Sequence, residues 1–349
     1  MPAEKGRWPM NRPQPNSEVS ATRTRRILPW ILLALLALVI LPLAIPIPPP
    51  RGVQPVQTLG GPDSDWIEVD GIQFHTTRRG SGQPVFVALH GFGAGTFSWR
   101  EMGGEDGPPG TVLAYDRPGF GLTERPTDPE AYRPRSAPGH LLGLMDAWDL
   151  DAAVLIAHSA GAPTALATAR QHPGRVSALI LVAPAVGGEP RGPSPTLCAL
   201  LDTPWMDRMG PLLLRATVPL LQRGLDRAWA DPAGPPPAVV ADYRRPLRAE
   251  GWDRGLWEVL RSRICHPGLH AIPESPDPSL PILVITGELD TIVDPADSRR
   301  LARELDAEFA AIPDAGHLPH EERPGAFLAI LREFLQSEGI APAPGELVP

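Results

Sequence analysis

The sequence has 349 residues, of which 42% are hydrophobic and 21% are charged, and this composition excludes a collagen, a coiled coil and a wholly disordered chain. The formal net charge of −8 argues against nucleic acid as a partner. Residues 1–50 nevertheless hold six basic and only two acidic side chains, so the acidic excess lies in the rest of the chain.

The first predicted element is an uncharged apolar run at residues 27–47. As a helix it would span roughly 31 Å, which matches the hydrocarbon core of a bilayer. Arg23, Arg25 and Arg26 precede it, so the positive-inside rule places a basic tail, residues 1–26, in the cytoplasm and the body of the protein outside. We predict a single-pass membrane anchor. A cleaved signal peptide, which would release a secreted body, is the alternative.

A stretch rich in proline and glycine follows at residues 48–64 and is predicted to form a linker. After it, Asp70-Gly71 separates two short apolar runs and predicts a β-hairpin. Further apolar runs recur at helix-length intervals, as the buried strands of a mostly parallel sheet do. The pattern predicts a doubly wound α/β domain over residues 65–340 and a flexible tail at 341–349. The expected strands are 66–69, 72–76, 85–89, 112–115, 153–157, 178–182, 282–286 and 309–312.

The regular spacing of strands breaks at about residues 186–279, a stretch rich in proline, arginine, leucine and tryptophan. We predict a mostly helical lid over the carboxyl ends of the strands, where α/β sheets bind ligands. Cys198 and Cys265, the two cysteines of the chain, fall in this lid. The sequence leaves open whether they form a disulfide or stay as two free buried thiols. The histidines are scattered, so no metal and no cofactor is predicted.

The strongest chemical motif lies at the end of the run 153–157, where His158-Ser159-Ala160-Gly161 precedes a helix-forming stretch. Small residues two positions before and after Ser159 allow the sharp strand-to-helix turn of a nucleophile elbow. Ala157 stands where the usual pattern has glycine. Ser159 is the predicted nucleophile, and His158 is expected to pack on the other side of the turn.

Two further polar residues follow strand ends. Asp290 comes just after the run 282–286, and His317 follows the last predicted strand. A serine hydroxyl becomes an effective nucleophile when a base takes its proton, so His317 is the predicted base and Asp290 the group that orients it. Asp294 and His320 are weaker alternatives for the acid and the base.

A sharp turn is also expected where the first parallel strand ends in His90-Gly91-Phe92-Gly93. We predict that the backbone amides of Phe92 and Ala160 form an oxyanion hole, which stabilises the negative charge of a tetrahedral intermediate. The residues expected to shape this loop and the site wall are His90, Gly91, Gly93 and Asp116, the last in an ion pair with Arg117.

These motifs resemble the α/β-hydrolase superfamily, in its lidded serine hydrolase branch, over roughly residues 66–335. The resemblance implies the α/β-hydrolase fold and the serine, acid, histidine order of its catalytic triad. Members that open epoxides or remove halogens carry aspartate at the elbow, so Ser159 implies acyl transfer instead. The matching pieces are His90-Gly91-Phe92-Gly93, Asp116-Arg117-Pro118-Gly119-Phe120-Gly121, His158-Ser159-Ala160-Gly161, Gly287-Glu288-Leu289-Asp290 and Gly316-His317.

The sequence therefore predicts a membrane-tethered serine hydrolase that cleaves carboxylic esters through an acyl-enzyme on Ser159. An apolar or lipid-like substrate would fit the tether and the lid. Two alternatives keep the same triad: hydrolysis of a carbon–carbon bond beside a ketone, and cofactor-free perhydrolase or haloperoxidase-like chemistry. A non-catalytic binding domain at the membrane is a third alternative.

Overall fold

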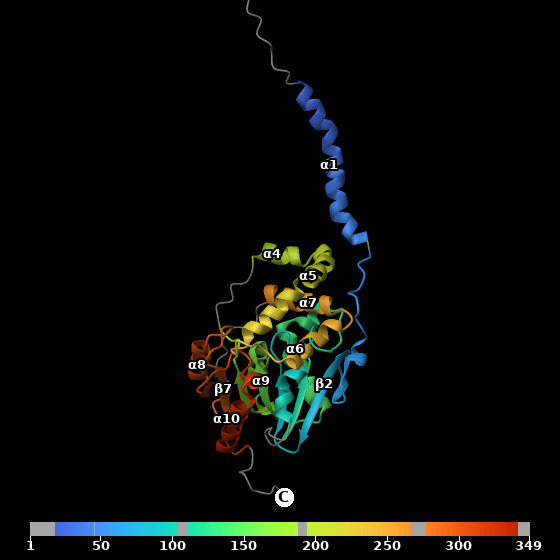
Figure 1. Ribbon diagram of the computed structural model, residues 1–349. Coiled ribbons are helices and arrows are strands. Elements are labelled where there is room, and N and C mark those ends of the chain that lie inside the picture. The colour runs from blue at the N-terminus through green and yellow to red at the C-terminus, as the bar shows by residue number, and fades with distance from the viewer. Residues whose placement is uncertain (1–17, 45, 104–109, 188–193, 267–276, 341–349) are drawn as a thin grey trace, which may run out of the picture. The chain divides into compact units, whose positions relative to one another are not determined.

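The computed structural model describes residues 18–44, 46–103, 110–187, 194–266 and 277–340, and divides the chain into two units that meet at residue 47 (Figure 1). The first unit contains helix α1 (Glu18–Ala44), and the second contains every other element. The tail predicted at 341–349 lies outside the described residues.

Helix α1 differs from the predicted membrane span at both ends. It begins in the polar stretch before residue 27, at Glu18, and it ends three residues before position 47. Within the described ranges, no helix combines the length and the apolar character that crossing a bilayer requires. The transmembrane anchor predicted at residues 27–47 is therefore not supported.

The second unit is built on an eight-stranded sheet of strand order β1-β2-β4-β3-β5-β6-β7-β8. Strand β2 pairs antiparallel with both β1 and β4, and every other neighbouring pair is parallel. This confirms the predicted hairpin and the mostly parallel sheet. The strands are β1 (Ser64–Val69), β2 (Ile72–Ser81), β3 (Val85–Leu89), β4 (Gly110–Tyr115), β5 (Ala153–His158), β6 (Val176–Val182), β7 (Ile282–Gly287) and β8 (Glu308–Ile312).

Both faces of the sheet are covered, which is why its central strands read as continuous apolar runs. All six residues of β5 are buried, and they alternate between two cores. Leu155 belongs to the core that includes Leu141 of α2, whereas Ile156 belongs to the opposite core with Phe327 of α10. The helices packed on the sheet are α2 (Ala137–Ala147), α3 (Ala162–Gln171), α8 (Pro295–Glu304) and α10 (Pro324–Ser337).

Short 3-10 helices complete the second unit between the longer elements. They are η1 (Val56–Leu59), η2 (Thr96–Gly103), η3 (Pro129–Tyr132), η4 (Pro134–Ser136), η5 (Ser159–Gly161), η6 (Pro173–Arg175) and η7 (Arg245–Arg248).

The segment predicted as a linker, residues 48–64, is part of the second unit and packs on its other residues. The Gln54 amide donates to the Arg248 carbonyl at 2.8 Å, and the Glu250 amide donates to the Gln54 carbonyl at 2.9 Å. Leu59 of η1 is buried against Leu122. The stretch from Gln54 to β1 is therefore held against the domain instead of extending away from it.

Among the described residues between β6 and β7, the region predicted as the lid contains the α-helices α4, α5, α6 and α7 and the 3-10 helix η7. Figure 1 shows three of them, α4, α5 and α7, gathered beyond one end of the sheet. Their core contains leucine and tryptophan side chains. Gly210 of α5 lies so close to the indole of Trp257 on α7 that an added Cβ would lie 2.2 Å from the ring. The lid helices are α4 (Pro195–Leu201), α5 (Pro204–Ala228), α6 (Pro237–Arg244) and α7 (Trp252–Cys265).

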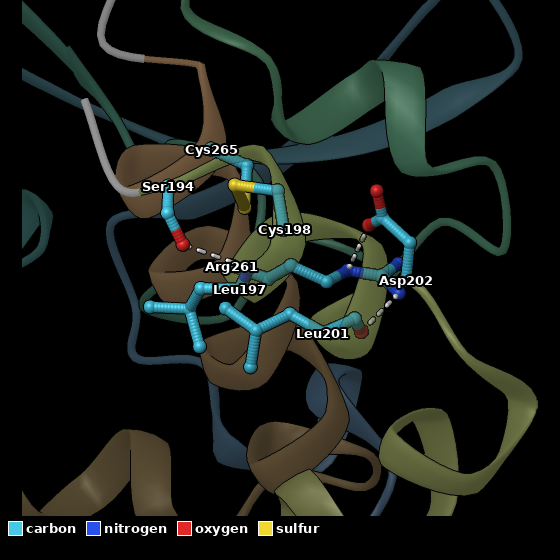
Figure 2. Close-up of a disulfide and its surroundings, with 7 residues drawn as sticks. All are labelled: Ser194, Leu197, Cys198, Leu201, Asp202, Arg261 and Cys265. Carbon is cyan, nitrogen blue, oxygen red and sulfur yellow. Dashed lines mark hydrogen bonds and ion pairs between the residues drawn. A yellow bond between two sulfur atoms is a disulfide. The ribbon is translucent and has the colours of Figure 1, made fainter.

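A disulfide joins Cys198 of α4 to Cys265 at the end of α7, with 5.5 Å between their Cα atoms (Figure 2). This settles the pairing that the sequence left open. Arg261 of α7 lies beside the bridge, where it donates to the Leu201 carbonyl and approaches the Asp202 carboxylate (Figure 2). The first and last lid helices are thus connected both covalently and by charge.

Replacing Cys198 and Cys265 together with serine is expected to lower the free energy of unfolding by about 2–4 kcal/mol, because the unfolded chain regains the freedom of a long closed loop. Urea unfolding followed by tryptophan fluorescence measures this change. Reductant should lower the free energy of unfolding of the parent protein and leave that of the double-serine variant unchanged. Equal stability of parent and variant would contradict the expectation.

Candidate active site

The backbone turns sharply at Ser159, between the end of β5 and the start of α3. Its φ of +47° lies in the left-handed region, which is strained for any residue other than glycine. The neighbours leave no room for larger side chains: a Cβ added to Gly161 would lie 2.7 Å from the Leu89 carbonyl oxygen, and Ala157 is fully buried. The segment therefore forms the elbow predicted from its small residues.

The structure brings Ser159, Asp290 and His317 together at the carboxyl ends of β5, β7 and β8. The Ser159 Oγ lies 2.9 Å from His317 Nε2, and His317 Nδ1 lies 2.8 Å from Asp290 Oδ2. These partners assign the tautomer in which Nδ1–H donates to the carboxylate and Nε2 accepts from the hydroxyl. The three side chains can pass a proton from the serine to the imidazole.

Asp290 is itself fixed by backbone donors. Its Oδ1 accepts from the amides of Ile292 and Val293 at 2.8 and 3.0 Å, which leaves Oδ2 for His317. The alternative acid, Asp294, instead caps the amino terminus of α8 by accepting from the Ala296 amide. The structure therefore distinguishes between the two carboxylates.

The alternative base, His320, contacts Ser98 and not Ser159. Its Nε2 lies 3.0 Å from Ser98 Oγ, and that hydroxyl donates to the buried carboxylate of Glu321. Burial, together with the charges of Arg100 and His317, lowers the pKa of His320 to about 3. A neutral, buried imidazole in this position serves packing.

The loop that carries His317 is held by a carboxylate that the sequence reading missed. Glu322 of α9 (Pro319–Glu322) accepts from the Gly316 amide at 2.7 Å and from the amides of Ala230 and Asp231, just after α5. The His317 amide donates to the Ala228 carbonyl at 2.8 Å. The histidine loop and the carboxyl end of the longest lid helix are thus one hydrogen-bonded unit.

His158 is buried next to His317, whereas the sequence placed it on the far side of the turn. Its Nε2–H donates to the His317 carbonyl at 2.9 Å, and the two rings lie 4.8 Å apart. Burial, the charge of His317 and that of His320 lower the pKa of His158. The prediction that it packs is right, but it packs against the backbone of the proposed base.

The turn after β3 lies directly against Ser159. A Cβ added to Gly91 would lie 2.4 Å from the His158 ring and 3.3 Å from the Ser159 Cβ, and Gly93 has a φ of +74°. Both positions therefore require glycine. His90 braces the turn: its Nδ1–H donates to the Gly91 carbonyl at 2.7 Å.

The proposed oxyanion donors flank this turn. Among loop and turn hydrogen bonds of the described chain, none uses the Phe92 amide, and Ala160 lies in the first turn of η5, where amides lack an acceptor within the helix. His90 Nε2 accepts from the Arg117 amide at 3.0 Å. Burial and the charge of Arg117 lower the pKa of His90 to about 3, so the ring stays neutral.

Asp116 does not form the predicted ion pair with Arg117. Its Oδ2 pairs with His75 of β2 at 2.7 Å, and its carboxylate accepts from the amides of Thr96 and Leu122 at 2.6 and 2.7 Å. Arg117 extends the other way, where its Nη1 donates to the Ala160 carbonyl at 3.1 Å. Adjacent side chains on an extended backbone point to opposite faces, which separates the two charges. Asp116 thus ties the loops after β3 and β4 to β2.

Comparison with known proteins identifies the family. The family model described as the Alpha/beta hydrolase family matches residues 85–330. The chain belongs to this family. The match covers the sheet from β3 onwards, the lid and the three strand ends that carry Ser159, Asp290 and His317.

Two curated relatives of this chain carry names that describe different reactions. A 2-hydroxy-6-oxo-2,4-heptadienoate hydrolase of Pseudomonas putida is 28% identical over 280 residues, which cover 77% of this chain and 94% of that protein. An epoxide hydrolase of Caballeronia sordidicola is 34% identical over 121 residues, which cover 34% of this chain and 36% of that protein.

Among solved structures, an alpha/beta hydrolase fold protein from Burkholderia ambifaria shares the fold, with a TM-score of 0.64 and 20% identity over 77% of this chain and 97% of that chain. Within the described residues, no group of three histidine, cysteine or acidic side chains is arranged to hold a metal ion.

Asp116 makes the stability of this hydrolase depend on acidity. Burial alone would raise the pKa of its carboxyl, but His75 and the Leu122 amide outweigh burial and lower the pKa to about 2. A carboxyl whose pKa is lower in the folded than in the unfolded chain stabilises the fold above about pH 4, and that contribution disappears as the pH falls towards 2.

The variant Asp116→Asn is therefore expected to lose about 2 kcal/mol of unfolding free energy at neutral pH, and to change less than the parent between pH 4 and pH 2. Urea unfolding at a series of pH values measures both effects. Asp151→Asn, which removes an exposed carboxylate, serves as the control. If the unfolding free energies of the parent and Asp116→Asn changed in parallel with pH, Asp116 would not be the source of this pH dependence.

Proposed function

We propose that this alpha/beta hydrolase cleaves carboxylic esters of small molecules through an acyl-enzyme on Ser159. The observation that carries the proposal is the continuous chain of contacts from Ser159 Oγ through His317 to Asp290, at 2.9 and 2.8 Å. This chain gives a buried serine both a proton acceptor and a group that stabilises the protonated acceptor.

The proposed reaction has two halves. Ser159 Oγ attacks the ester carbonyl while His317 Nε2 takes the hydroxyl proton, and the amides of Phe92 and Ala160 stabilise the resulting oxyanion. The carbon–oxygen bond to the alcohol then breaks, and His317 returns the proton to the departing alkoxide. In the second half a water molecule attacks the acyl-enzyme, His317 again takes and returns a proton, and the acid leaves from Ser159.

A second candidate reaction is hydrolysis of a carbon–carbon bond beside a ketone. The observation that favours it is the near full-length similarity to the Pseudomonas putida hydrolase named above. Perhydrolase or haloperoxidase-like chemistry would use the same three residues. The epoxide hydrolase match is shorter, and serine at the elbow favours acyl transfer over epoxide opening. The contacts of Ser159 argue against a purely binding role.

We further propose that the enzyme works outside the cytoplasm. The Cys198–Cys265 disulfide supports this, because such bonds persist in oxidising compartments. The acyl chain next to the ester carbonyl is expected to be apolar, since Phe120 and Val259 line the pocket that Ala160 also lines.

The variant Ser159→Ala is expected to lose both labelling by a fluorophosphonate probe and hydrolysis of 4-nitrophenyl esters. Asp290→Asn should lower kcat by about 10⁴-fold while the fold stays intact, because the imidazole then loses its orienting charge. Ser177→Ala, an exposed serine on β6, is the matched control. Undiminished hydrolysis by Ser159→Ala would rule out the proposed mechanism.

A series of 4-nitrophenyl esters of increasing acyl length separates the ester reaction from carbon–carbon cleavage. Turnover with a clear length optimum supports ester hydrolysis. Fluorophosphonate labelling of Ser159 without any ester turnover, combined with cleavage of a vinylogous diketone, would favour the second candidate.

A further inference from the structure

Three arginines line one pocket beside the proposed oxyanion hole: Arg117, Arg133 and Arg263. Arg133 pairs with Glu130 at 2.8 Å, and the other two come from distant parts of the chain. Arg117 follows β4, and Arg263 lies in the last turn of α7, so one wall belongs to the sheet and the other to the lid. Phe120, Tyr132, Ala160 and Val259 complete the lining that matters here. The described lining contains no aspartate or glutamate.

Arg117 has unused hydrogen-bonding capacity. Its Nη1 donates to the Ala160 carbonyl at 3.1 Å, but its Nε and Nη2 atoms are buried and have no hydrogen-bond partner in the described structure. Buried donors without partners are costly and rare. Nε and Nη2 form one edge of the planar guanidinium, the edge that can hold both oxygens of a carboxylate.

Arg263 is the second unmatched charge. It is partly buried and makes no hydrogen bond or ion pair with another described residue; its guanidinium lies 5.4 Å from the centre of the Phe92 ring. The lid contains acidic side chains, but Asp207 and Glu258 pair with Arg261 on the same helix and not with Arg263. Burial, with the charge of Arg263, lowers the pKa of Arg117 to about 10, so two like charges repel each other here.

The position of the two charges relates them to catalysis. Arg117 contacts Ala160, and Arg263 contacts Phe92. These are the two residues whose amides are proposed to bind the oxyanion. An anion held between the two guanidinium groups would therefore lie close to the reacting acyl group, and it would relieve both the repulsion and the unpaired donors.

We propose that Arg117 and Arg263 bind a carboxylate on the acyl part of the substrate, so that the preferred substrates are half-esters of dicarboxylic acids. This inference rests on the proposed ester hydrolysis. A side-on contact with Arg117 and a second charge from Arg263 would fix the acyl chain with its ester carbonyl towards Ser159. The two arginines are then binding residues, and no bond is made or broken at them.

The test compares two esters of matched acyl length: mono-4-nitrophenyl glutarate, which carries a carboxylate, and 4-nitrophenyl valerate, which does not. The parent is expected to favour the glutarate ester in kcat/KM by at least about 10-fold, the range that a charged hydrogen bond supplies. Arg263→Gln should lower this preference by about 10- to 100-fold, mainly through KM for the glutarate ester. Arg263→Lys keeps the charge, so its preference for the glutarate ester should lie between those of the parent and Arg263→Gln.

The matched control is Arg223→Gln, which removes an exposed arginine from α5 and lies outside the pocket. It should leave the ratio of the two kcat/KM values unchanged. Because the readout is a ratio, a general loss of activity or stability in Arg263→Gln does not imitate the expected result. A parent without preference for the glutarate ester, or an unchanged ratio in Arg263→Gln, would overturn the carboxylate site.

A binding measurement separates this inference from the proposed function. Calorimetric titration of the Ser159→Ala protein with glutarate should show saturable binding, at least about 10-fold weaker after Arg263→Gln is added. If neither ester is hydrolysed but glutarate binds in this way, the result supports the carboxylate site and contradicts the proposed ester hydrolysis. If glutarate does not bind, the site falls whatever the ester assays show.

Discussion

The left-handed backbone at Ser159 is the constraint on which the rest of the site depends. A φ of +47° in a residue with a side chain costs of order 1–3 kcal/mol, so the surrounding structure must impose it. The buried strand β5 fixes one end of the turn, and α3 fixes the other. Gly91 and Gly161 allow the neighbouring backbone to approach, and the hydroxyl is thereby held towards His317 without help from a flexible loop.

The proposed base is held from two sides that belong to different layers of the molecule. His158, which leads into the elbow, donates to the His317 carbonyl, and the His317 amide donates to the Ala228 carbonyl at the end of α5. Glu322 then links the same loop to the first residues after α5. A shift of the lid relative to the sheet would therefore move the imidazole, so the lid takes part in positioning His317 as well as in covering the strand ends.

Local patterns predicted the strands and the strand-end positions of Ser159, Asp290 and His317, because each depends on a few adjacent residues. Continuous apolar runs marked the buried strands, and a polar residue directly after a run marked a strand end. The partners of Asp116 could not be predicted this way, since His75 lies 41 residues away on an antiparallel strand. The disulfide depended on the distance between two lid helices, and the membrane span was inferred from the length of an uncharged apolar run and the basic residues before it. The partners of Asp116, the disulfide and the ends of helix α1 each depend on a contact or a helix boundary, and composition does not specify either.

The disulfide and one arginine of the proposed carboxylate site, Arg263, both lie on helix α7. Arg263 lies two residues before Cys265, whose bridge to Cys198 fixes the end of that helix, and one residue after Ser262, which is buried. A free arginine loses about 2 kcal/mol of side-chain entropy when it is ordered, and a lid that moved would add a backbone cost to this loss. Because α7 is anchored through α4 by the bridge and through Arg261 by charge, its last turn is ordered before any ligand arrives. The repulsion between Arg117 and Arg263 is then present in the folded protein before binding, and the proposed carboxylate would relieve it.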